Sequence, residues 1–441
     1  MKAKTGLIAI AAAAVLSGAN ALTEDEISEL LKTYDDVLVQ ADTGKADSSF
    51  ANGEHWYGKA IPESGKKYYV PSGMRINDPA GSASYTFPGT LVLSGYIQAM
   101  CSGGYSLTYN PLRMQNGSEY RFSSFNKVQG RIYVDSTADN PARFMIFYNN
   151  SENVFDVRAT FYGGEDNVLA FARSGVPAAN SFIPGPRIVL DGKFDDDGKF
   201  DNYYGSLVIC SNAMIKSSLG NWGNAKIKVE REGYLFLDFT REFAAMRSLA
   251  LEDGARLLIS PDWELREDSA PIYISEELKI GNDVKLENFA KFAQPTSSVY
   301  RFALARLSDA AYEKGVSLPE RIDLPERMFG GFPRNPRLEI ADGAGGEKML
   351  FVVYESALTV VKNGESSPSE ARSRQGMTIS GLRRGSPRAA PTPRFLSPHR
   401  PFSGPARRRS GRMPFFISTR PRTSRIPRST PISKCIRAVQ L

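Results

Sequence analysis

The chain has 441 residues, a formal net charge of +7, three Cys and two His. Three cysteines in a chain of this length exclude a fold held together by a disulfide framework. Because His55 is the only histidine before residue 399, we expect no Ser-His-Asp or Cys-His catalytic centre and no His-rich metal site. We interpret His55, which precedes Trp56, as a surface turn residue.

Residues 1–21 have the features of a secretory signal peptide. Two lysines form a short basic start, Leu7–Leu16 is an unbroken apolar run, and the small residues up to Ala21 form a cleavage site before Leu22. The apolar run is shorter than the roughly 20 residues that span a bilayer, and no later stretch could span it as a helix. We therefore expect a protein that is exported, either secreted or located at the cell surface.

Residues 22–48 are predicted to form a short helix and a linker. Thr23 followed by Glu26 is a capping box, which marks the start of a helix. Four apolar residues then fall on one helical face: Ile27, Leu30, Leu31 and Tyr34.

Residues 49–363 are predicted to form an all-β body. Short apolar or alternating runs recur and end at Gly, Asn, Asp or Pro, which is the pattern of half-buried strands separated by turns. The clearest runs are Thr90–Ser94, Arg131–Asp135, Arg143–Tyr148, Val157–Tyr162, Val168–Ala172, Arg187–Leu190, Ser206–Cys210, Lys226–Glu230, Tyr234–Phe239, Arg247–Leu251, Arg256–Ser260, Arg337–Ile340 and Met349–Val361. One later helix is predicted over Val299–Lys314, ended by Gly315.

Two architectures fit this succession of strands and turns. A β-solenoid adds coil after coil without a limit on length, and the long run of strands without a domain break favours it. A β-sandwich is the alternative, because the spacing is irregular and no strict repeat is visible.

Several short motifs follow one another in the body and support the solenoid. They are His55-Trp56-Tyr57-Gly58, Ala60-Ile61-Pro62, Gly65-Lys66-Lys67-Tyr68-Tyr69-Val70, Gly73-Met74-Arg75 and Tyr85-Thr86-Phe87-Pro88-Gly89-Thr90-Leu91-Val92-Leu93. This series resembles the secreted, autotransporter-passenger-like β-strand repeat proteins of Verrucomicrobia, Planctomycetes and Lentisphaerae. Gly220–Leu251 resembles their strand repeat, and Phe329–Val361 resembles their closing strands. The resemblance implies a right-handed parallel β-helix that is exported or surface-exposed. We expect it to be secreted, or located at the cell surface or in the periplasm of a Gram-negative-type bacterium.

An acidic segment offers the best candidate site. Asp195, Asp197 and Asp201 lie close together beside glycines, and closely spaced carboxylates in a flexible loop suit Ca²⁺. The spacing does not match an EF-hand, and a solvated turn has the same composition. With Arg187 nearby, the three aspartates could also imitate the calcium site and base of a β-helix polysaccharide lyase.

Aromatic residues offer a second route to carbohydrate binding, by stacking on sugar rings. The candidates are Trp56, Tyr57, Tyr68, Tyr69, Tyr203, Tyr204 and Trp222. Because Tyr is common on sheet faces, we favour a structural role for them. Among the cysteines, a Cys101–Cys210 disulfide and two buried thiols are equally compatible with the sequence.

Residues 364–441 are predicted to be a disordered tail that accounts for the positive charge. From Ala371 to Leu441 there are 16 Arg, one Lys and no Asp or Glu, whereas residues 1–370 have a net charge of −10. Such an Arg/Pro/Ser-rich segment buries too little apolar surface to fold. A basic arm, a Pro-rich linker and a frameshift near Asn363–Arg372 are the three explanations, and the abrupt loss of acidic residues favours the frameshift.

Taken together, these features predict a non-enzymatic exported β-solenoid with a surface, adhesion or structural role. An extracellular polysaccharide-binding or polysaccharide-lyase-like protein is the alternative. We expect no cofactor other than the possible calcium, no specific nucleic acid as a partner and no membrane span.

Overall fold

The computed structural model describes residues 22–39, 49–77, 84–99, 106–122, 127–146, 154–174, 187–239, 243–287, 299–324 and 333–356. All of these residues belong to the first of the two units into which the chain divides, residues 1–371. The predicted signal peptide, the predicted tail and Cys101 lie outside the described residues, as does most of the predicted linker.

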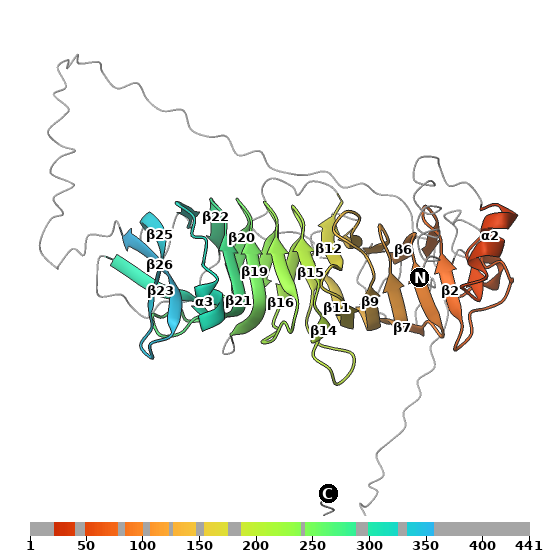
Figure 1. Cartoon of the computed structure of the whole chain (residues 1–441), viewed down its shortest axis with the longest axis horizontal. Coiled ribbons are helices and arrows are strands. Elements are labelled where there is room, and N and C mark those ends of the chain that lie inside the picture. Colours follow the sequence, from red (N-terminus) through yellow and green to blue (C-terminus); the bar gives the residue numbers. More distant parts are fainter. Residues whose placement is uncertain are drawn as a thin grey trace, which may run out of the picture. The chain divides into compact units, whose positions relative to one another are not determined.

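The described chain is a β-solenoid with two long sheets that run side by side (Figure 1). Consecutive strands alternate between the two sheets from β5 to β13 and from β15 to β24. The first sheet is ordered β1 (Asp36–Val37), β2 (Lys67–Val70), β5 (Thr90–Leu93), β7 (Ser106–Met114), β9 (Lys127–Val134), β11 (Val154–Gly163), β13 (Arg187–Val189), β16 (Met214–Ser217), β18 (Tyr234–Leu237), β20 (Arg256–Ile259), β22 (Val284–Glu287) and β24 (Ile322–Asp323), with β4 (Tyr85–Thr86) beside β7 and β14 (Asn202–Tyr203) beside β11. The second sheet is ordered β3 (Arg75–Asn77), β6 (Tyr96–Ala99), β8 (Glu119–Phe122), β10 (Ala142–Ile146), β12 (Val168–Arg173), β15 (Ser206–Ile209), β17 (Lys226–Val229), β19 (Ala244–Leu251), β21 (Ile272–Ile280), β23 (Val299–Leu307), β26 (Lys348–Ser356) and β25 (Pro333–Asp342).

Strand pairing confirms the solenoid and rules out the β-sandwich alternative. Neighbouring strands in both sheets pair in parallel, from β1 to β24 in the first sheet and from β3 to β23 in the second. Parallel neighbours require a crossover between them, which here is the strand of the opposite sheet. Each strand run predicted between Thr90 and Ser260 overlaps a strand.

The core consists of ladders of inward-facing side chains between the two sheets. Along β17 and β18 buried and half-buried residues alternate, as expected for strands with one wet face. Register places Leu207, Ile227 and Leu249 in line on three successive strands, and each is 1 % exposed. Burying a side chain of this size stabilises the fold by about 1.5–3 kcal/mol, so regular stacking of such residues holds the coils together.

Coil length explains why no strict repeat is visible in the sequence. Ser206 pairs with Lys226 and Lys226 pairs with Ser248, so these coils are about 20 to 22 residues long. Val168 instead pairs with Ser206, so the preceding coil is about 38 residues long. The extra residues include the acidic segment, which therefore lies outside the regular coil.

The helix at the start of the described chain confirms its prediction. Helix α2 (Glu24–Leu30) begins at Thr23 with both hydrogen bonds of the capping box. The apolar residues predicted to share one face, Leu30, Leu31 and Tyr34 among them, pack on Val37, Tyr69 and Val92 at the first strands of the first sheet. The prediction for His55 is half right, because this residue ends a single turn of 3-10 helix, η2 (Gly53–His55), but is only 8 % exposed.

The helix predicted over Val299–Lys314 is wrong for its first half. Residues Val299–Leu307 form β23, and only Asp309–Glu313 forms helix α3, capped by Ser308. Ala, Leu and Arg favour a helix locally, but burial on both faces of the sheet overrides this preference, since Phe302 through Ala305 are all buried. β23 then pairs antiparallel with β26, and β25 completes the hairpin that ends the second sheet. No helix in the described ranges is long and apolar enough to cross a membrane.

Candidate functional site

The predicted site residues lie in a turn that runs from Asp191 to Asp201, between β13 and β14, which we call the acidic turn. Asp195 connects this turn to the outer face of the first sheet. Its carboxylate accepts hydrogen bonds from Arg131 Nε at 2.9 Å and from Thr160 Oγ1 at 2.6 Å. Burial opposes ionisation of Asp195, but the hydrogen bonds from Thr160, Arg131 and Tyr162 outweigh it and lower the pKa.

Tyr162 makes hydrogen bonds to both Asp195 and Asp197. Its hydroxyl donates to Asp195 Oδ2 at 3.3 Å and to Asp197 Oδ2 at 3.4 Å. Burial, followed by the negative charges of Asp195 and Asp197, raises the pKa of Tyr162 to about 12. The phenol is therefore a hydrogen-bond donor at neutral pH and is not a base.

The aromatic rings along this face stack on their neighbours in the next coil. Tyr133 and Tyr162 have ring centroids 4.7 Å apart at 15°, and the Arg113 guanidinium lies 5.0 Å from the Tyr133 ring centre. Arg113 is held in turn by a two-pronged ion pair with Asp135, with both N–O distances 2.8 Å. Because their faces are stacked on each other or covered by Arg113, the rings of Tyr133 and Tyr162 leave their edges and hydroxyls for a ligand. They can form hydrogen bonds with a sugar but have little free face on which a sugar ring could stack.

Asp201 and Arg187 do not join this cluster. Asp201 Oδ2 accepts the Gly198 N–H at 3.0 Å and closes the end of the turn, while Asp197 accepts from Asn202 at 2.9 Å. Arg187 lies at the start of β13, and its buried Nε has no hydrogen-bond partner among the described residues. Within the described residues, no group of three or more His, Cys, Asp or Glu is placed to hold a metal ion.

Calcium binding at Asp195, Asp197 and Asp201 stays a prediction. The substitution Asp195→Asn tests it, and it also tests the contact between the acidic turn and Arg131. Asp195→Asn should lower the free energy of unfolding by up to about 1 kcal/mol, because the partly exposed Arg131 loses its charged hydrogen-bond partner. Asp196→Asn, whose carboxylate is exposed, is the matched control. The measurement is urea unfolding with and without Ca²⁺. The calcium site is supported if Ca²⁺ stabilises the wild type and if both Asp195→Asn and Asp197→Asn abolish this stabilisation. If Asp196→Asn lowers the free energy of unfolding as much as Asp195→Asn does, the contacts assigned to Asp195 are contradicted.

A buried lysine anchors the acidic turn to the core. Lys199 is 2 % exposed, and its Nζ donates to the carbonyls of Gly192, at 2.7 Å, and Val157. Burial lowers the pKa of Lys199 to about 7, although the carboxylates of Asp156 and Asp191 raise it. Such an amine could take up protons near neutrality, but its position beneath the turn makes it an anchor rather than a base that meets substrate.

Most of the aromatic candidates are part of the core, as favoured from the sequence. Trp56, Tyr68, Tyr69, Tyr203 and Trp222 are all buried. Tyr204 and Tyr57 are each 42 % exposed, and Phe194, at the tip of the acidic turn, is 39 % exposed. The sequence reasoning missed Phe194, although an apolar residue between Asp and Lys in a turn could have pointed to it.

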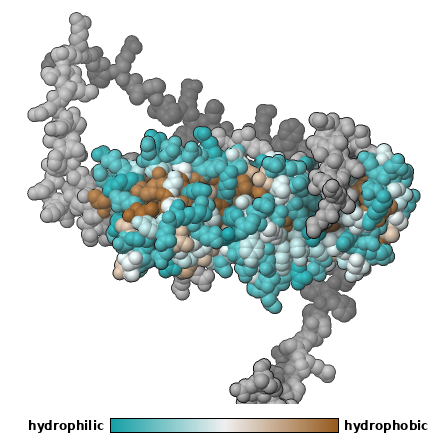
Figure 2. All heavy atoms as spheres, viewed as in Figure 1, coloured by the Kyte–Doolittle hydropathy of each residue, from teal (hydrophilic) through white to brown (hydrophobic). Residues whose placement is uncertain are grey.

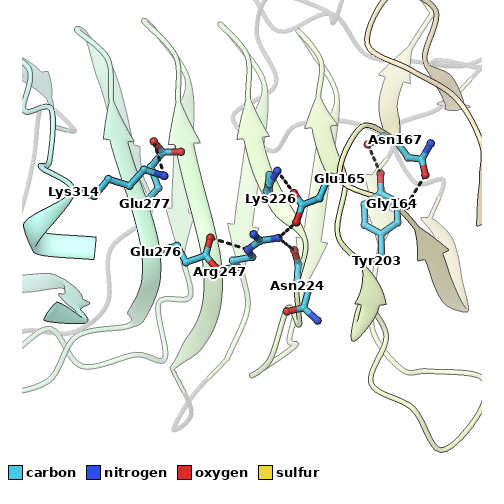
Figure 3. A network of polar contacts seen from close by, with 10 residues as sticks. All are labelled: Gly164, Glu165, Asn167, Tyr203, Asn224, Lys226, Arg247, Glu276, Glu277 and Lys314. Carbon is cyan, nitrogen blue, oxygen red and sulfur yellow. Dashed lines mark hydrogen bonds and ion pairs between the residues drawn. The ribbon is translucent and has the colours of Figure 1, made fainter. Parts of the chain in front are cut away.

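The second sheet has its own polar network on its outer surface (Figure 3). Arg247 Nη1 pairs with Glu165 at 2.9 Å and Arg247 Nε with Glu276 at 2.8 Å, while Lys226 also pairs with Glu165. Glu277 pairs with Lys314 at 3.4 Å farther along the same sheet. These ion pairs connect successive coils and neutralise one another, so the network stabilises stacking and leaves little net charge to attract a ligand.

Figure 2 shows a largely hydrophilic face with hydrophobic residues gathered in a band over the part of the body nearer β23 and β26. A shallow hollow lies between Arg231, Glu252 and Asp253 at the coil turns. Burial raises the pKa of the Cys210 thiol to about 12, so this half-buried cysteine is a poor nucleophile.

Comparison with known proteins identifies no relative: no protein-family model, no curated protein and no solved structure matches the chain.

Proposed function

We propose that the protein is an exported, non-enzymatic β-solenoid with a surface or structural role, and that the acidic turn contacts its extracellular partner. One observation carries the proposal. The polar side chains of the two outer sheet faces form ladders that pair with one another across coils, as Arg113 does with Asp135 and Arg247 with Glu276. A surface of this kind stabilises a long scaffold, because each pair connects neighbouring coils.

Three groups of the acidic turn do not fit the role of a catalytic acid or base, which supports the non-enzymatic proposal. Asp195 has a lowered pKa, Tyr162 has a raised pKa, and Lys199 is buried beneath the turn. A general acid or base works best with a pKa near the working pH and within reach of the substrate. None of these three groups combines the two properties, which favours binding over catalysis.

A polysaccharide-binding role is the second candidate, and the exposed aromatic residues favour it. Phe194 and Tyr204 are exposed within and just beyond a turn that also presents the carboxylates of Asp196 and Asp197. Aromatic rings stack on sugar rings, and carboxylates accept hydrogen bonds from sugar hydroxyls. Because residues 1–370 have a net charge of −10, we expect a neutral polysaccharide rather than a polyuronate.

Incubation of the full chain with insoluble polysaccharides tests both candidates. We expect no release of soluble or unsaturated sugars from neutral glucans, xylan or pectin. If the turn binds a neutral glycan, Phe194→Ala and Tyr204→Ala should each reduce the retained protein about tenfold, which corresponds to about 1.4 kcal/mol. Phe243→Ala, which removes another 42 %-exposed ring, is the control. Product release that depends on Asp195 would contradict the non-enzymatic proposal, and retention unaffected by both variants would contradict binding at the turn.

A further inference from the structure

The ends of the two sheets differ in how their backbone edges are covered. An uncovered strand edge is a template for pairing with another chain. The first sheet ends in β1 and β24, which are only two residues long, and the Tyr57 N–H donates to the Val37 carbonyl on the outer side of β1 at 2.9 Å. The second sheet begins at β3, where the Phe50 N–H donates to the Asn77 carbonyl at 3.0 Å. Three of the four edges are therefore short or covered.

The fourth edge, β25, is long and open in the part of the chain that the structure describes. This strand has ten residues and is the last in its sheet, beyond β26 (Figure 1). In the described ranges, no hydrogen bond connects its outer edge with another segment. Its first half is protected, because Pro333 and Pro336 lack an N–H and the register with β26 shifts between Arg334 and Arg337. The open part is Arg337–Asp342.

The side chains of this open part are self-complementary in one antiparallel register. Arg337 and Glu339 lie on one face, where they are 48 % and 40 % exposed and pair with each other at 2.8 Å within the chain. Leu338 and Ile340 lie on the other face, partly buried at the rim of the core. If two copies pair antiparallel with Leu338 opposite Leu338, each Arg337 lies opposite the other copy's Glu339. A pairing centred on Arg337 or Glu339 would instead place like charges opposite each other, which destabilises a strand pair.

We propose that two copies of this chain associate through Arg337–Asp342 of β25, so that their second sheets become one continuous sheet. The partner is a second copy because the register that satisfies the charges has twofold symmetry. Each copy offers one such edge, so the assembly closes at two chains. The dimer presents two acidic turns, and two weak contacts on one extended ligand bind more tightly than one. The dimer does not depend on the function proposed for the turn.

Charge exchange at β25 tests this proposal in the full chain. Size-exclusion chromatography with light scattering should give a mass about twice the 48.5 kDa of one chain at high concentration. Arg337→Glu and Glu339→Arg should each weaken association at least tenfold, because each places like charges opposite each other. The double variant should restore association. Lys32→Glu makes the same change of charge as Arg337→Glu, but in the turn after α2, near the first strands of the body, and should leave the dimer intact.

Thermal unfolding of each variant identifies any loss of association that is caused by misfolding. A single-chain mass at every concentration of the folded wild type would overturn the proposal. So would assemblies larger than two chains, or a dimer that both single variants leave unchanged. Binding of an extended peptide by a monomeric wild type would assign the edge to a different partner and would also overturn self-association.

Discussion

Replacing Lys199 by Met should remove a rise in stability that the wild-type protein shows between about pH 7 and pH 10. Burial lowers the pKa of Lys199 in the folded state to about 7, from 10.5. In this window the unfolded chain therefore binds one more proton than the folded chain. Stability that depends on this group is lowest below the folded pKa, increases as the pH rises, and reaches its full value above the unfolded pKa.

The expected slope is about 1.4 kcal/mol per pH unit from this one group. The charged groups that influence the amine are Asp156, Asp191 and Arg158, and the first two oppose the lowered pKa. Other groups, Cys210 among them, also titrate at high pH. The measurement is therefore the difference in the free energy of unfolding between wild type and Lys199→Met, followed by urea unfolding at several pH values.

Lys193→Met is the matched control, because it removes an exposed lysine from the same turn. It should leave the pH dependence of stability unchanged. If wild type and Lys199→Met show the same slope between about pH 7 and pH 10, the amine is solvated in solution, and the acidic turn is not anchored as described.

Replacing Phe144 by Ala should lower the free energy of unfolding by about 3–5 kcal/mol. Phe144 is fully buried on β10 and lies in line with Tyr120 on β8 and Phe171 on β12. Its ring centre is 5.6 Å from Tyr120, 6.0 Å from Phe171 and 6.2 Å from Phe161. Truncation removes contacts with the strands before and after β10 and leaves a cavity between the stacked coils.

Phe194→Ala provides the control for Phe144→Ala, because the same ring is removed from a 39 %-exposed position. Its effect on stability should be within about 0.5 kcal/mol. The measurement is the urea midpoint of the full chain. Equal losses in the two variants would show that the aromatic ladder between the sheets does not hold neighbouring coils together.

The sequence by itself determined the all-β class, the capping box at Thr23 and the approximate place of the strands. These features depend on local chemistry. Apolar and polar residues alternate along the strands, turn residues stand at the ends of the runs, and Thr23 and Glu26 cap the helix across three residues of sequence. For the same reason it indicated that rings such as Trp222 and Tyr203 are structural.

Tertiary structure alone decided the rest. The segment Val299–Leu307 has helix-favouring residues and became a strand because β26 and β21 lie on either side of it. The grouping of Asp195 and Arg131, 64 residues apart, depends on the coil that brings β9 and β11 together under the acidic turn. The burial of Lys199 and the open edge of β25 could likewise not be predicted from local sequence patterns. Lysine in a polar turn is ordinarily exposed, and a strand edge exists only relative to the strands beside it.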